Sequence, residues 1–146
     1  MVRRLRKENG TALMEAAFTL PILLLIAVGI FEFGRAFQTW QVLTNAAREG
    51  ARVAVLPNPD PNAAVQRVRD YMQMGQLPNY ASATVTITAT NVQVGASTSP
   101  GSQVRVSYPF SFIVLNPVIQ LITPGSTTGA QALNMVSTAT MRNESP

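Results

Sequence analysis

The chain has 146 residues, of which 47% are hydrophobic and only 12% are charged, so one modest domain with a largely buried or lipid-covered surface is expected. It contains no cysteine and no histidine, which excludes disulfides and catalysis by a thiol or an imidazole. The net charge is +4, but no basic stripe interleaved with aromatic residues accompanies it, so nucleic-acid binding is not expected.

The acidic residues also argue against an enzyme. The seven carboxylates are spread along the chain, as Glu8, Glu15, Glu32, Glu49, Asp60, Asp70 and Glu144. A pair of carboxylates for acid–base chemistry would have to be brought together by the tertiary fold alone. We therefore expect no catalytic residues, no metal site and no cofactor.

The N-terminal region predicts a membrane anchor. A basic cluster in residues 3–7 precedes residues 11–31, in which Glu15 is the only charged residue. As a helix these 21 residues would rise roughly 31 Å, about the thickness of the hydrocarbon core. The flank after the span is balanced by Glu32 and Arg35, so the basic flank places the N-terminus in the cytoplasm. We expect a single-pass inner-membrane protein whose C-terminal domain lies outside.

A cleaved secretory signal is the alternative interpretation of this region. It shares the basic start and the apolar centre, but no small-x-small cleavage site follows the apolar run. Residues 27–29 (Ala-Val-Gly) come nearest, and a cut there would sever one continuous helix. The pattern therefore favours a retained anchor.

Two residues within the apolar run are unusual. Pro21 removes a backbone donor and predicts a helix kink, although transmembrane helices also tolerate prolines that have no role. Glu15 is an ionisable group in a span, and such groups usually mark function. Because Glu15 lies near the cytoplasmic edge, its side chain could instead reach the nearby headgroups.

The helical pattern continues beyond the membrane over residues 32–56, until the Pro-rich residues 57–61 end it. Apolar residues spaced three and four apart predict one face of this helix: Phe33, Phe37, Trp40, Ala47, Ala51 and Val55. That face has to be covered. The cover is either the chain's own C-terminal domain alone or that domain together with neighbouring copies or partner helices.

The remaining residues, 57–146, predict a small α+β domain. A short helix is expected over residues 61–74, ended by Gly75. Its apolar face is predicted to consist of Val65, Val68 and Met72. Residues 118–122 are short and apolar, and they predict a helical turn or a membrane-proximal patch.

Alternating side chains predict three strands, over residues 84–90, 103–114 and 132–142. The alternation slips at Val92 and Val94, which predicts a bulge or bend. Residues 95–102 and 123–129 are expected to be loops. Pro109 predicts an edge strand or a bulge.

A series of motifs runs through residues 9–52. They are Gly10 followed five residues later by Glu15, Leu20-Pro21, the Gly-x-x-Glu-x-Gly-Arg stretch of residues 29–35, and Leu-Thr-Asn-Ala-Ala-Arg-Glu-Gly-Ala-Arg over residues 43–52. In this order and spacing they closely resemble the N-terminal segment of the TadE-like family of tight-adherence (Tad) pilus assembly proteins, which are pilin-like minor subunits. The resemblance covers nearly a third of the chain.

The resemblance implies that a prepilin peptidase cuts between Gly10 and Thr11. The cut would create an ammonium on Thr11, one helical turn from Glu15. The Glu15 carboxylate would then pair with that ammonium or with the one on a neighbouring subunit and set the register of assembly. Ala16 differs from the aromatic residue that often follows this glutamate in the family.

The predicted function is a minor pilin or pseudopilin that helps to assemble a Tad-type surface pilus for adhesion and is itself incorporated in the pilus. Its expected partners are the membrane, the prepilin peptidase, other pilin-like subunits and the Tad secretion machinery. The alternative is a permanently anchored envelope protein that docks components of the secretion machinery through its outer domain.

The predicted fold is α+β, with a long N-terminal helix packed against a small antiparallel sheet in a pilin-like arrangement. Its expected divisions are a basic leader (residues 1–10), a transmembrane helix (11–31), an extramembrane continuation of that helix (32–56) and a small extracytoplasmic domain (57–146).

Overall fold

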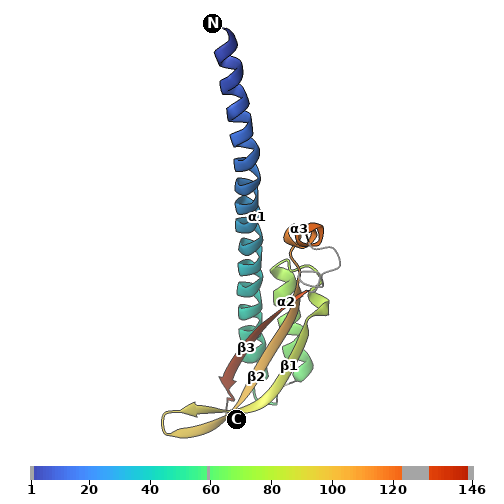
Figure 1. Ribbon diagram of the computed structural model, residues 1–146. Coiled ribbons are helices and arrows are strands. Elements are labelled where there is room, and N and C mark those ends of the chain that lie inside the picture. The colour runs from blue at the N-terminus through green and yellow to red at the C-terminus, as the bar shows by residue number, and fades with distance from the viewer. Residues whose placement is uncertain (1, 59, 123–131, 145–146) are drawn as a thin grey trace.

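The computed structural model describes residues 2–58, 60–122 and 132–144 (Figure 1). The predicted loop at residues 123–129 lies outside the described residues. In chain order the elements are α1 (Val2–Ala54), α2 (Pro61–Met74), the 3-10 helix η1 (Tyr80–Ser82), β1 (Thr84–Val94), β2 (Ser97–Phe110), α3 (Leu115–Ile122) and β3 (Leu133–Arg142). The three strands form one antiparallel sheet in the order β1-β2-β3, which confirms the predicted α+β fold.

The long helix α1 has two distinct halves. Its N-terminal half stands free, whereas α2 and the sheet lie along its C-terminal half (Figure 1). From Gly10 onward α1 is long and apolar enough to cross a membrane, and no other described helix meets that criterion. The helix continues through Pro21, and its ribbon shows no sharp bend, so the predicted kink stays a prediction for the protein in lipid.

The core of the outer domain forms where α1 meets α2 and β2. Small residues of α1 allow this close approach, because a Cβ atom added to Gly50 would lie 2.4 Å from Val68 Cγ2 of α2. The fully buried residues of the core are Leu43, Ala46, Ala47, Ala51, Ala64, Val68, Met72, Val104 and Val106. The chain's own domain therefore covers one side of the outer half of α1, as expected.

The prediction of which residues form the covered apolar face of the outer helix is only half right. Ala47, Ala51 and Val55 are buried, but Phe33, Phe37 and Trp40 are 66%, 59% and 49% exposed. The domain instead covers a face of α1 that bears mostly small side chains. Large aromatic rings would hold α2 and the sheet too far away for a packed interface.

Helix α2 has the predicted bounds. The Asp60 side chain accepts a hydrogen bond from the Asn62 amide at 2.8 Å and so caps the first turn. The helix ends at Gly75 as expected, but the left-handed residue is Gln76, with φ 55°. Gly75 has an ordinary φ of −75°, and an added Cβ would lie 2.6 Å from Val42 Cγ1, so its small size serves packing on α1. On the inner face of α2, Ala64 is buried where Val65 had been predicted.

The first hairpin differs from the prediction in the length of its turn and in lacking a bulge, one of the two alternatives predicted at residues 92–94. Strand β1 pairs with β2 in continuous register from Thr84↔Ser107 to Val94↔Ser97, so there is no bulge at residues 92–94. The turn is a short one at residues 95–96 rather than a loop over 95–102. Gly95 supplies the positive φ, 63°, that such a tight hairpin turn requires.

Strand β2 lies at the centre of the sheet, although Pro109 had predicted an edge strand or a bulge. The proline is tolerated because pairing with β1 ends at Thr84↔Ser107, so at Pro109 only β3 is a neighbour, through Asn134. The final strand β3 lies within its predicted range. Beyond it the Glu144 amide donates to the Val55 carbonyl at 2.9 Å, which ties this end of the sheet to the end of α1.

Candidate functional site

The residues predicted for processing and assembly lie on the free half of α1. Gly10, Thr11 and Glu15 are all exposed and helical. No atom outside the local backbone lies within 4 Å of where a Gly10 Cβ would be. Glu15 lines a shallow hollow together with Ala12, Ala16, Thr19 and Leu20. The three smallest of these side chains leave room for another helix to approach Glu15.

A line of large apolar side chains on α1, which we call the outer stripe, is exposed. It consists of Ile26, Ile30, Phe33, Phe37 and Trp40, with exposed fractions of 54%, 71%, 66%, 59% and 49%. The spacing alternates between four and three residues, which is the pattern of a helix that packs against another helix. The stripe runs from the predicted span into the outer half of α1 without interruption.

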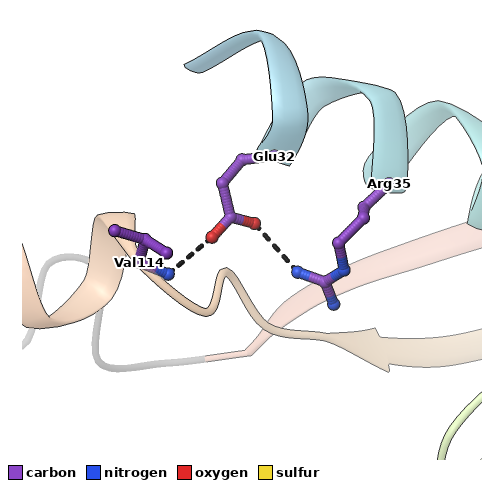
Figure 2. Close-up of polar contacts among 3 residues, drawn as sticks. All are labelled: Glu32, Arg35 and Val114. Carbon is purple, nitrogen blue, oxygen red and sulfur yellow. Dashed lines mark hydrogen bonds and ion pairs between the residues drawn. The ribbon is translucent and has the colours of Figure 1, made fainter. Parts of the chain in front are cut away.

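A buried charge on α1 lies where the free half meets the outer domain. Glu32 is completely buried, and its carboxylate has two partners in Figure 2. Its Oε1 accepts a hydrogen bond from the Val114 backbone amide at 2.5 Å, and its Oε2 pairs with Arg35 Nη1 at 2.9 Å. Glu32 therefore joins α1 to the segment that leads into α3, 82 residues further along the chain.

The electrostatics of this junction favour a charged carboxylate. Burial alone would raise the pKa of Glu32, but hydrogen bonds from the backbone amides of residues 113–115 and the positive charge of Arg35 together lower it below its usual value. Arg35 also lies 5.2 Å from the centre of the Phe110 ring, which holds the guanidinium against β2. The junction is thus an ion pair with a fixed geometry.

A cleft of about 440 Å³ lies beside Arg35, between α1, the loop after α2 and the end of β2. Tyr108 lines it and donates a hydrogen bond to the Pro78 carbonyl. Burial raises the pKa of the Tyr108 phenol, against the opposing effect of Arg35, so the phenol is neutral at physiological pH. Among the described residues of the wall Arg35 is the one cationic group, and it is paired with Glu32, so these residues give the cleft little attraction for an anion.

The other charged contacts on the outer half of α1 are at the surface. Glu49 pairs with Arg67 of α2 at 3.0 Å and with Arg52 at 3.8 Å, and both arginines are largely exposed. In the part of the chain that the structure describes, no group of three or more acidic side chains is placed to hold a metal ion.

The sequence shows Glu32 and Arg35 as balancing charges just after the span, but it does not indicate that Glu32 is buried. The available signal was its position, because it is the first charged residue after sixteen uncharged ones, in residues 16–31. Its partner, the amide of Val114, carries no sequence signal at all. The contact depends on how the fold returns the chain to α1.

Comparison with known proteins gives one match. The family model described as TadE-like protein matches residues 10–52, which agrees with the resemblance carried by the motifs of residues 9–52. The matched region contains Gly10, Glu15 and Glu32. No curated protein and no solved structure matches the chain.

Proposed function

Because the TadE-like family model matches residues 10–52, we propose that the chain is a minor pilin or pseudopilin that a prepilin peptidase processes and that helps to assemble a Tad-type surface pilus for adhesion. The family match suggests involvement in the Tad pilus system, and a single N-terminal helix is consistent with a single-pass membrane protein. The subunit role, the inside-to-outside orientation, the processing and the adhesion are our proposal.

The observation that carries this proposal is the exposed outer stripe of α1. The predicted span ends at Phe31, and helical rise puts Trp40 roughly 13 Å beyond that residue. The headgroup layer on one side of a bilayer is only roughly 5–7 Å thick. Lipid therefore covers the start of the outer stripe but not Trp40. The chain's own domain reaches the stripe at Phe33, through the Phe112 ring, and leaves Phe37 and Trp40 exposed. A second long helix, which leaves the membrane alongside α1, would cover the whole stripe.

Processing would change the chemistry at the inner end of the same helix. Cleavage between Gly10 and Thr11 removes the basic leader and leaves an ammonium on Thr11. The helix is continuous on both sides of this bond, so a peptidase that binds an extended chain has to unwind it first. Gly10 makes unwinding easier, since glycine disfavours a helix by about 1 kcal/mol relative to alanine.

Once Thr11 carries an ammonium, Glu15 can neutralise it within the same subunit or across the shallow hollow in a neighbouring one. Either pairing removes two unfavourable charges from the edge of the lipid. Pairing between subunits would also fix their relative height, because a shift by one helical turn separates the charges by about 5.4 Å.

Analysis of the mature N-terminus tests the processing. In a host with an active prepilin peptidase, intact-mass measurement of membrane-purified protein should give a chain that begins at Thr11. Gly10→Val should block the cut, whereas Gly29→Ala, a second helical glycine with open surroundings, should leave it unchanged. A wild-type chain that keeps residues 3–7 would contradict the proposal and favour the permanently anchored alternative.

Piliation tests the role of Glu15. Glu15→Ala should still insert into the membrane but should lose surface pili. Glu8→Ala is the matched control, because the cut would remove residue 8 before assembly. Full piliation of the Glu15→Ala strain would exclude the proposed pairing.

A further inference from the structure

The short helix α3 lies at a particular height along α1. It is at the end of the outer domain that faces the free half of the long helix (Figure 1). The hydrogen bond from the Val114 amide to Glu32 Oε1, at 2.5 Å, fixes the start of α3 beside Glu32 (Figure 2). Leu115, the first residue of α3, therefore lies close to the level of Glu32.

Glu32 in turn marks the outer limit of the hydrocarbon core. Residues 16–31 carry no charge, whereas Glu32 and Arg35 form an ion pair within the next turn of α1. A buried ion pair belongs outside the acyl chains, so the headgroup layer begins at about this level. If α1 spans the membrane, α3 starts within roughly one headgroup thickness of the acyl chains.

The composition of α3 suits that environment. Its sequence, LNPVIQLI, has no charged residue and only two polar side chains, Asn116 and Gln120. In the sequence, the apolar residues of this helix follow the spacing i, i+3, i+4, i+7 from Leu115, a pattern that predicts one apolar side. An amphipathic helix of this kind can lie in the plane of the membrane with its apolar side toward the acyl chains.

The described positions around α3 show where it is open. Among the described elements, α3 makes a small contact with α1, and Gln120 is exposed. Ile113, just before the helix, is 59% exposed. An exposed apolar side chain at this height is stabilised when lipid covers it.

We propose that α3 lies in the outer headgroup layer of the bilayer and that the hydrogen bond between Glu32 and Val114 holds it at that depth. The outer domain would then touch the membrane at two places, through α1 and through α3, and this would fix its tilt. The inference rests on membrane insertion of α1 but not on pilus assembly. A subunit that leaves the bilayer would have to withdraw α3 as well as the span.

The cysteine-free chain allows a direct test by single labelling. The full chain is reconstituted in phosphatidylcholine vesicles that contain a lipid with a nitroxide on its headgroup. A fluorophore is attached to Ile113→Cys or to Gln120→Cys, both of which are exposed positions. Gln93→Cys, in the hairpin strand of β1, is the matched control. We expect at least twofold stronger quenching at residues 113 and 120 than at residue 93.

A fourth label separates this inference from the membrane anchor itself. Leu24→Cys lies within the predicted span and should be quenched by a nitroxide on the acyl chain. Quenching at residue 24 combined with control-level quenching at residues 113 and 120 would overturn the role of α3 while the anchor stands. The role of α3 would also be overturned if the lipid nitroxide does not quench the labels at residues 113 and 120 and these labels become shielded from solvent only as the protein concentration rises. A second copy of the chain, rather than lipid, would then cover α3.

The contribution of Glu32 needs its own variant. Glu32→Leu keeps a similar side-chain size but removes the acceptor for the Val114 amide, so quenching at residue 120 should fall by about half. Glu49→Leu, which removes a surface ion pair of the same helix, should leave quenching at residue 120 unchanged. If Glu32→Leu also leaves it unchanged, with circular dichroism like that of the wild type, Glu32 does not set the depth of α3.

Discussion

The two halves of α1 expose their apolar residues in different ways. In the predicted span large side chains are exposed around the helix, as Leu13, Phe18 and Leu24 show at 71%, 72% and 68%. In the outer half one side is fully buried against the domain, while Phe37 and Trp40 remain exposed on another. A helix that is apolar all round needs lipid, whereas a helix with one uncovered stripe needs a partner of matching shape. The same helix thus has two different surroundings, with Glu32 at the boundary.

The largest effect is expected where the two halves meet. Glu32→Ala would leave Arg35 without its anion and the Val114 amide without its acceptor. Removing one partner of a fully buried ion pair typically costs about 3–5 kcal/mol of folding free energy, and because Arg35 is 24% exposed we expect a loss no larger than the lower end of that range. The loss of folding free energy is measured by denaturing the full chain in detergent and monitoring the fluorescence of Trp40.

Glu49→Ala is the control for that experiment, because Glu49 pairs with the exposed Arg52 and Arg67. A surface pair of this kind contributes about 1 kcal/mol at most. Equal destabilisation by the two variants would show that the boundary residue has no special role.

A smaller loss is expected inside the buried interface of the outer half. In Gly50→Ala the new methyl group would meet Val68 Cγ2 at 2.4 Å, and overpacking of this kind costs about 1–3 kcal/mol. In Gly34→Ala the new methyl group meets nothing within 4 Å and the helix gains up to about 1 kcal/mol. The two substitutions should therefore shift the denaturation midpoint in opposite directions. A stabilised Gly50→Ala variant would contradict the close packing of α1 on α2.

Acid should weaken the boundary in a defined pH range. The pKa of Glu32 is lower in the folded protein than its ordinary value of 4.5, so its contribution to stability is complete above pH 4.5. That contribution is lost as the pH falls through the lower pKa of the folded state. Unfolding curves between pH 3 and pH 7 should therefore show a steeper loss below pH 4.5 for the wild type than for Glu32→Gln. Parallel curves would argue against a charged, hydrogen-bonded Glu32.

The smallest effect on folding is expected on the exposed stripe. Replacing both Phe37 and Trp40 with serine removes two rings whose centroids lie 6.2 Å apart. Both rings are exposed and pack little on the domain. Stability, followed by circular dichroism, should change by no more than about 0.5 kcal/mol. Surface pili should nevertheless be lost if the stripe packs on a partner helix. Normal piliation of this variant would show that the stripe is not an assembly surface.

Local patterns predicted much of this fold because local physics controls those elements. The uncharged run of residues 16–31 dictates a helix in lipid whatever surrounds it. The bounds of α2 followed from Asp60-Pro61 at its start and Gly75 at its end. The first hairpin was harder to predict from the sequence. Its end, where the alternation slips at residues 92–94, extends beyond β3. Because neither face of that stretch packs on a core, its side chains need not alternate.

By itself, the sequence determined the long helix, the predicted span within it, the α+β class and the TadE-like motifs, since each depends on residues close together in the chain. Only the tertiary structure decided which side of the outer helix is buried. Periodicity favoured the large rings, but close packing selected the side with Ala47, Gly50 and Ala51. The structure also decided that Glu32 is buried, because its amide partner at Val114 is contributed by a distant segment that only the folded domain brings to α1.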